Sequence, residues 1–239
     1  MEEIKLFLNE AYLKYGIRKY VTWNLASGHL VVFGSTGSGK TTATKLILAR
    51  ISKHIPDSQI WVNDYKGDST DYAFLQGSDR FYRFNEVKEG LDDFYEEFRK
   101  RQSGENNRRN HIICCIEEWN SYIMSLDKKS AEDEKKKLGT LLFMGRSYGV
   151  HILLSQQRMD SCNYSAGSRD QYSVVIGLGN LSTEAKEMMF REYKDQMKSD
   201  NKKHSGFMVT NGTDFTRIQV PFISDMSKIN YYIKEAVCR

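Results

Sequence analysis

Short apolar runs alternate with longer amphipathic stretches along most of the chain. Five runs have the length and composition of buried strands: Leu30–Phe33, Ile60–Val62, Ile112–Ile116, Val150–Leu154 and Val174–Ile176. Apolar residues at helical spacing fall between them, at Leu91, Phe94, Tyr95 and Phe98 and again at Leu138, Leu141 and Leu142. Strands that alternate with helices predict parallel βαβ units in a sheet covered on both faces. We therefore expect an α/β fold.

The two ends of the chain follow other patterns. Apolar residues near the N-terminus recur at helical spacing and predict an amphipathic helix: Ile4, Phe7, Leu8, Ala11, Tyr12 and Tyr15. Near the C-terminus, Gly206–Val209 and Arg217–Val220 are separated by Asn211-Gly212, which predicts a β-hairpin followed by a short helix. We expect residues 1–22 to form an N-terminal helical segment and residues 23–239 to form one large domain.

Composition and charge exclude several classes of protein. The 239 residues are 40% hydrophobic and 28% charged, which is typical of a globular chain and not of a disordered one. No apolar run approaches the roughly 20 residues of a membrane-spanning helix, and the N-terminus does not have the pattern of a secretory signal, so a cytoplasmic chain is expected. The four cysteines, Cys114, Cys115, Cys162 and Cys238, lack zinc-site spacing and are expected to be reduced. A net charge of +4 is only a mild preference for polyanions.

The strongest chemical motif is a glycine-rich loop. Residues 34–41 read Gly-Ser-Thr-Gly-Ser-Gly-Lys-Thr and fit the phosphate-binding pattern G-x-x-x-x-G-K-[ST]. The loop follows a predicted strand and precedes the helical stretch Thr42–Ile51, which is the context that the motif requires. Backbone N–H groups and the helix N-terminus would face the phosphates, Lys40 would bridge the β- and γ-phosphates, and Thr41 would hold Mg²⁺. The predicted nucleotide-binding residues are Gly34, Ser35, Thr36, Gly37, Ser38, Gly39, Lys40, Thr41 and Thr42.

Two adjacent carboxylates follow the strand Ile112–Ile116. Consecutive strand residues point to opposite faces, so Glu117 and Glu118 have different roles while the strand stays regular. We expect Glu117 to hold Mg²⁺ through water and Glu118 to polarise the attacking water. ATP and Mg²⁺ are the predicted substrate and metal.

The motifs together resemble the motor domain of the FtsK/SpoIIIE family, DNA-translocating ATPases of the wider HerA/FtsK group. The resemblance begins near Trp23 and covers most of the chain. The matching stretches, in order, are Gly34–Lys40 (Walker A), Asn63-Asp64-Tyr65-Lys66 (similar to Asp-Pro-Lys), Ile116–Trp119 (Walker B), Gly145–Arg158, and the tail segments Ser205–Met208 and Arg217–Asp225. The stretch Gly145–Arg158 is the most specific, because it is similar to the family's arginine, its Gly-Ile-His strand and its Thr-Gln-Arg end.

The resemblance implies a fold, an assembly and roles for four residues. The fold would be a RecA-like P-loop NTPase: a mostly parallel sheet with helices on both faces and a C-terminal β-hairpin. The assembly would be a hexameric ring around double-stranded DNA. The implied catalytic residues are Lys40, Glu118 as base, Gln157 as sensor of the γ-phosphate, and Arg146 as a finger that reaches the neighbouring subunit's nucleotide.

The sequence also departs from the family pattern. Glu117 replaces the usual first Walker B aspartate, and Met159 stands where the family has proline. An arginine expected near Ser173 is missing, although Arg169 lies close. We expect no membrane anchor, long linker or winged-helix module, and this expectation favours a mobile element over chromosome segregation.

Two basic stretches are candidates for DNA contact. The first is Arg99-Lys100-Arg101 with Arg108-Arg109, and the second is Asp127–Lys137, which lies between Glu118 and Arg146 and is preferred by its position. The candidate residues are Arg99, Arg101, Lys128 and Lys129. The alternative for both stretches is a solvated helix face or helix end.

The leading hypothesis is an ATP-hydrolysing DNA translocase that serves conjugation, plasmid transfer or genome packaging. Such a motor would bind double-stranded DNA, form a homo-oligomer, and work with a relaxosome, secretion-channel or capsid partner. A second hypothesis is a nucleotide-gated assembly protein for DNA processing with little hydrolysis. A third is a small-molecule kinase, although no acceptor pocket or arginine-bearing lid is visible in the sequence.

Overall fold

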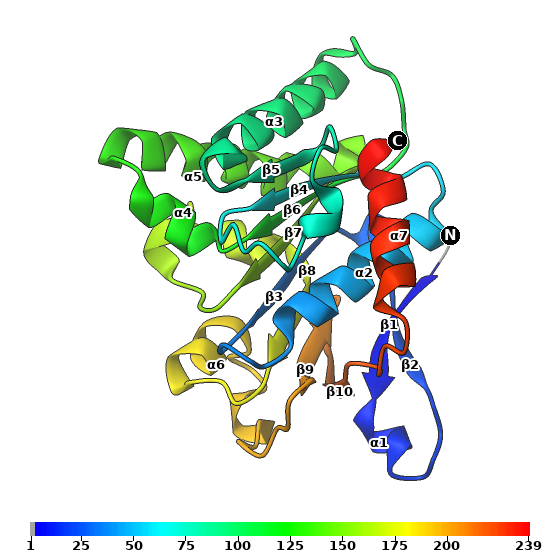
Figure 1. Ribbon diagram of the computed structural model, residues 1–239. Coiled ribbons are helices and arrows are strands. Elements are labelled where there is room, and N and C mark those ends of the chain that lie inside the picture. The colour runs from blue at the N-terminus through cyan, green and yellow to red at the C-terminus, as the bar shows by residue number, and fades with distance from the viewer. Residues whose placement is uncertain (1–2) are drawn as a thin grey trace.

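A computed structural model describes residues 3–239, while Met1 and Glu2 of the predicted N-terminal segment lie outside the described residues. Ten strands form one mixed sheet in the order β2-β1-β10-β9-β8-β3-β7-β6-β4-β5 (Figure 1). Their bounds are β1 Glu3–Asn9, β2 Tyr20–Asn24, β3 His29–Gly34, β4 Gln59–Asp64, β5 Phe81–Arg83, β6 Ile112–Glu117, β7 Val150–Gln156, β8 Tyr172–Leu178, β9 Ser205–Thr210 and β10 Asp214–Gln219. The five strands predicted from apolar runs correspond to β3, β4, β6, β7 and β8, which confirms those predictions.

Helices cover both faces of the sheet. They are α1 Glu10–Leu13, α2 Lys40–His54, α3 Val87–Ser103, α4 Trp119–Ser125, α5 Lys128–Met144, α6 Thr183–Met189 and α7 Met226–Cys238. Helices α2 and α7 pack on one face, and α3, α4 and α5 pack on the other (Figure 1). Within residues 3–239, none of these helices combines the length and the apolar composition needed to cross a bilayer.

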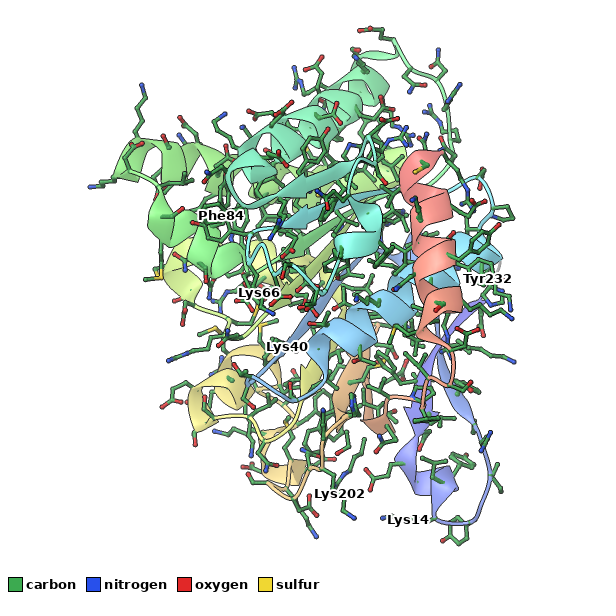
Figure 2. All side chains as sticks on the ribbon, viewed as in Figure 1. Lys14, Lys40, Lys66, Phe84, Lys202 and Tyr232 are labelled. Carbon is green, nitrogen blue, oxygen red and sulfur yellow. The ribbon has the colours of Figure 1, made fainter. Side chains whose placement is uncertain are left out.

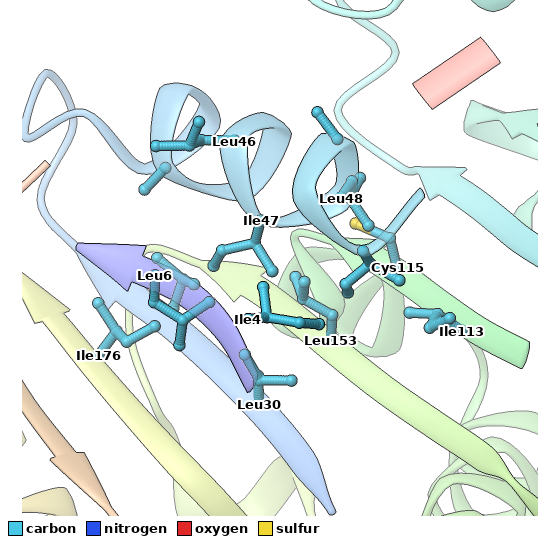
Figure 3. Packing of buried hydrophobic residues seen from close by; sticks show 14 of the residues in the cluster. Ile4, Leu6, Leu30, Leu46, Ile47, Leu48, Ile113, Cys115, Leu153 and Ile176 are labelled. Atoms are coloured by element: carbon cyan, nitrogen blue, oxygen red, sulfur yellow. The ribbon is translucent and has the colours of Figure 1, made fainter. Parts of the chain in front are cut away.

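The central strands are buried on both faces, which explains their nearly continuous apolar runs. In β3, Leu30 and Val32 belong to the core under α2 and α7, while Val31 and Phe33 belong to the core under α3 and α5. Figure 3 shows the first of these cores, where Leu46, Ile47 and Leu48 of α2 lie over strand residues that include Leu153.

The sheet has a parallel part and an antiparallel part. Strands β8, β3, β7, β6, β4 and β5 pair in parallel, so their carboxyl ends meet at one edge. The hairpin β9–β10 adds to β8 in antiparallel fashion, and β1 and β2 extend that side. The predicted α/β fold, with a mostly parallel sheet, helices on both faces and a C-terminal hairpin and helix, is confirmed.

The prediction of an N-terminal helix is wrong. Residues 3–9 form β1, which pairs with β2 and β10, and α1 is a single turn. A β-bulge shifts the register between Lys5 and Phe7, so the strand buries Leu6, Phe7 and Leu8 in succession. This break in the alternation, together with Ile4, produces an apolar spacing that resembles a helix. The strand is instead held by its partners and by α2, beneath which Ile4 and Leu6 lie in Figure 3.

Candidate active site

The glycine-rich loop joins β3 to α2 at the carboxyl edge of the parallel strands. Gly34 has a φ of 152°, and a Cβ there would lie 2.2 Å from the Leu178 carbonyl oxygen, so no side chain fits. Gly39 caps α2 with a left-handed φ of 102°. The Lys40 ammonium donates hydrogen bonds to the carbonyl oxygens of Gly34 (2.8 Å) and Ser35 (3.1 Å). Burial lowers the pKa of Lys40, and the carboxylates of Glu118 and Glu117 oppose this shift.

Glu117 is the last residue of β6, and its side chain is buried. The Tyr72 hydroxyl donates a hydrogen bond of 2.7 Å to Glu117 Oε1. Burial raises the pKa of Glu117 to about 7, and the hydrogen bond from Tyr72 limits the rise. The carboxylate of this glutamate is therefore held by Tyr72, which lies in the connection between β4 and β5.

Glu118 departs from strand geometry. Its φ of 60° and ψ of 48° are left-handed, so the strand ends at Glu117 and α4 begins at the next residue, Trp119. The expectation that the two carboxylates point to opposite faces required a regular strand through Glu118, and the strand stops before it. Both carboxylates line one pocket. Burial raises the pKa of Glu118, while Lys40 and hydrogen bonds from Gln157 lower it. A non-glycine residue held at positive φ is typical of a functional site.

The pocket between these groups has a volume of about 300 Å³. Its lining residues are Thr36, Gly37, Gly39, Lys40, Thr41, Thr42, Asp64, Lys66, Asp71, Tyr72, Glu117, Glu118, Gln157, Lys203 and His204. Nine of these lining residues were predicted from the sequence as site residues. Gly34 and Ser35 line a neighbouring pocket instead, and Ser38 is buried within the loop.

Six lining residues were not predicted as site residues. Asp64 and Lys66 end β4 and begin the following turn, and their place at a strand end was a usable signal. Figure 2 shows Lys66 and Lys40 at the same edge of the sheet. Tyr72, Lys203 and His204 carry no signal in the sequence, because distant segments bring them to the pocket. Asp71, the sixth residue, forms an ion pair with Lys66 at 2.9 Å.

The donor set fits a magnesium ion that arrives with a nucleotide. The Thr41 hydroxyl and the Glu117 carboxylate line the same pocket, as does Asp64. Asp64 Oδ2 is buried without a hydrogen-bond partner, and burial raises the pKa of this carboxyl. Oxygen ligands of this kind are the ones that Mg²⁺ prefers.

Arg146 does not join this pocket. It lies in a single 3₁₀ turn, Gly145–Tyr148, that precedes β7, and its side chain is exposed. Its charge acts on His29, the first residue of β3, whereas the phosphate loop follows the last residue of that strand. The length of β3, roughly 16 Å at the usual rise per residue, therefore separates Arg146 from its own chain's site.

A comparison with known families identifies the chain. The family described as "Helicase HerA, central domain" matches residues 13–208. The chain belongs to this HerA family. The FtsK domain-containing protein YdcQ of Bacillus subtilis is 22% identical to it over 219 residues, covering 84% of this chain and 45% of YdcQ. This HerA-family chain therefore spans less than half the length of that relative, and the resemblance to the HerA/FtsK group is confirmed.

Solved structures share the fold of the HerA-family chain. The cytoplasmic domain of the type VII secretion ATPase EccC from Thermomonospora curvata has a TM-score of 0.72 at 15% identity, covering 98% of this chain and 31% of that one. The pCW3 conjugation coupling protein TcpA, solved with ATPγS, has a TM-score of 0.69 at 20% identity, covering 90% and 67%. The genome packaging NTPase B204 of Sulfolobus turreted icosahedral virus 2 has a TM-score of 0.57 at 11% identity, covering 82% and 99%. These likenesses confirm a RecA-like P-loop ATPase fold.

One predicted DNA contact of the HerA-family chain is wrong. The Arg101 side chain is buried and donates to Glu97 (3.1 Å), to the Asn110 carbonyl oxygen (2.7 Å), to the Tyr148 carbonyl oxygen (3.1 Å) and to Asn110 Oδ1 (3.0 Å). The bond to Glu97 lies within α3, and the three bonds to Asn110 and Tyr148 tie the end of α3 to the loops at the amino edge of the sheet. Arg101 is therefore a structural residue, while Arg99, two positions earlier, is exposed.

The other DNA candidates stay on the surface of the HerA-family chain. Lys128 and Lys129 are exposed in the first turn of α5, and Asp127 caps that helix by accepting from the backbone N–H groups of Lys129 and Ser130. Farther along α5, Lys135, Lys136 and Lys137 each pair with an acidic residue three positions earlier. The lysine-rich stretch therefore consists of an exposed helix start and a paired helix body.

Proposed function

We propose that the chain hydrolyses ATP and uses the energy to move double-stranded DNA. The observation that carries the proposal is the convergence of Lys40, Glu118 and Gln157 on one pocket at the start of α2. Membership of the HerA family supports the proposal. TcpA and B204, whose structures share the fold, were solved with an ATP analogue, which supports nucleotide binding here.

The residues divide the chemistry between them. Backbone N–H groups of the loop and the Lys40 ammonium bind the phosphates, so Lys40 exchanges its two carbonyl acceptors for phosphate oxygens. Thr41 and Glu117 would hold Mg²⁺, which would supply positive charge to the phosphates. Glu118 accepts a proton from the attacking water, and burial, by raising its pKa, makes it a stronger base than a solvated glutamate. Gln157, hydrogen-bonded to Glu118, reports the state of the γ-phosphate.

The place of Arg146 supports the proposal of a ring. This exposed cation lies at the edge opposite its own pocket, so its use in hydrolysis requires a second subunit. We expect Arg146→Ala subunits, mixed into wild-type protein at constant total concentration, to depress ATP hydrolysis more steeply than their fraction. A strictly linear decline would contradict a hexameric ring with shared sites.

The exposed start of α5 is the favoured DNA contact, together with Arg99. Charge reversal at Lys128 and Lys129 is expected to weaken binding of duplex DNA and to reduce the salt slope of log K by about 1 to 2. The matched control is charge reversal at Lys228 and Lys234, two exposed lysines of α7 on the other face of the sheet. Equal losses in both variants would assign the effect to net charge and not to a DNA contact.

A role in a mobile element is the proposed biological setting. TcpA is described as a conjugation coupling protein and B204 as a genome packaging NTPase, and this chain has their fold. The motor would act in the cytoplasm, with a relaxosome, a secretion channel or a capsid as partner.

The deciding experiment is steady-state ATP hydrolysis with and without long linear duplex DNA, with Lys40→Ala as background. Stimulation that fades as salt rises supports a DNA-coupled motor. Nucleotide binding without hydrolysis or stimulation would favour a nucleotide-gated assembly protein. The second function is supported by Glu117, which replaces the usual aspartate next to the proposed catalytic carboxylate of Glu118.

A further inference from the structure

His204 bridges the phosphate loop and the C-terminal hairpin. It directly precedes β9, and its φ of 65° is left-handed. Its backbone N–H donates to the carbonyl oxygen of Ser38 in the loop (3.0 Å), and its own carbonyl oxygen accepts from Val220 N–H (2.8 Å) and Gln219 Nε2 (3.0 Å). One residue therefore connects the phosphate loop to the end of β10.

The His204 ring packs against the glycine that caps α2. A Cβ on Gly39 would lie 2.3 Å from His204 Nδ1, so the ring occupies the space that a side chain would need. Nδ1 is buried there without a hydrogen-bond partner. The residue also lines the nucleotide pocket, next to the exposed Lys203. The ring is thus enclosed on the loop side and open to the pocket.

Neither feature helps the chain fold. Glycine adopts a left-handed φ more readily than histidine, and a buried ring nitrogen without a partner is an uncompensated polar group. Such strain and unsatisfied polarity concentrate at sites that bind ligands. Burial and the neighbouring Lys203 lower the pKa of His204, which favours a neutral ring with one bare nitrogen and one N–H.

We propose that His204 is a nucleotide-binding residue whose Nε2–H donates to a phosphate oxygen of the bound nucleoside triphosphate. Nδ1 is enclosed against Gly39 without a partner, so the proposal assigns the bare nitrogen to Nδ1 and the hydrogen to Nε2, the nitrogen free to meet a ligand. The Lys203 ammonium adds positive charge beside this donor. The backbone bonds of His204 then connect an occupied loop to β10. The inference rests on the proposed binding of ATP and adds a residue from outside the motif.

The test compares His204→Gly with wild-type protein by calorimetric titration with Mg²⁺-ATP and with Mg²⁺-tripolyphosphate, which lacks base and sugar. Glycine accepts the left-handed φ, so the ligand-free variant is expected to unfold at the same temperature or higher. Its affinity for both probes is expected to fall about tenfold, as for loss of one hydrogen bond to a charged group. His204→Asn, which tolerates the backbone and keeps an N–H donor, is expected to recover part of the loss. His54→Asn, at the exposed end of α2, is the matched control.

The outcomes separate this inference from the proposed function. Wild-type affinity in His204→Gly overturns the inference and leaves ATP binding intact. A loss for ATP with none for tripolyphosphate overturns the phosphate contact. Wild-type protein that binds neither probe overturns the proposed function, and the inference with it.

Discussion

The two edges of the parallel sheet contain buried polar groups of opposite character. At the amino edge, His29 Nε2 bonds to the Leu142 carbonyl oxygen (3.0 Å), and its Nδ1 accepts from Ile152 N–H (3.0 Å). His151 lies between His111 (2.8 Å) and the Gly28 carbonyl oxygen (3.1 Å). Both ring nitrogens of each buried histidine are therefore paired within the chain.

The carboxyl edge leaves polar atoms without partners. Asp64 Oδ2, Ser38 Oγ and His204 Nδ1 are buried and unpaired there, and burial raises the pKa of Glu117 and Glu118. Buried polar groups are normally satisfied in folded proteins. The comparison teaches that folding satisfies the buried histidines of the amino edge, whereas the carboxyl edge leaves polar atoms free for a ligand that brings its own charges.

The largest expected effect is a loss of ATP hydrolysis at the carboxyl edge. Glu118→Gln keeps the size of the side chain but removes the base, so ATP hydrolysis should fall by at least about a hundredfold while nucleotide affinity is retained. Steady-state hydrolysis and equilibrium titration measure the two quantities. Glu105→Gln, on an exposed loop, is the control. Hydrolysis at the wild-type rate in Glu118→Gln would remove Glu118 as the base.

A smaller effect is expected at the amino edge, where a change should cost stability. Arg101→Met keeps the apolar stem but removes the donor to the carbonyl oxygens of Asn110 and Tyr148, so the free energy of unfolding should fall by about 3 kcal/mol. Arg99→Met, at an exposed position of the same helix, should change it by less than about 0.5 kcal/mol. Chemical denaturation measures both. Equal changes would show that burial of Arg101 contributes nothing.

The smallest expected effect is a pH dependence of stability that arises from Glu117 at the carboxyl edge. The pKa of Glu117 rises from 4.5 to about 7 on folding, so the folded protein holds a proton that the unfolded chain releases. Stability from the neutral carboxyl is present below about pH 4.5 and is lost as the pH rises through 7. Glu117→Gln stays neutral, so without nucleotide and Mg²⁺ its Tm should exceed that of wild type by a margin that grows from pH 5 to pH 8. A constant margin would contradict the raised pKa.

Local sequence patterns predicted the parts of the fold whose structure depends on neighbouring residues in the chain. The strands β3, β6 and β7 are buried on both faces, so their apolar runs identify them without reference to neighbours. The phosphate loop is equally legible, because its glycines meet a backbone requirement that no other residue meets. The strand β1 was missed because its bulge changes the alternation that identifies a strand.

The sequence by itself determined the α/β architecture, the phosphate loop and the pair Glu117 and Glu118, because each depends on residues close together in the chain. The tertiary structure alone decided that Tyr72 holds Glu117, that Arg101 is buried, and that His204 lies against Gly39. The physical reason is that hydrogen bonding and burial join residues 45 positions apart in the first case and 165 in the last. Such pairings leave no period or spacing in the sequence.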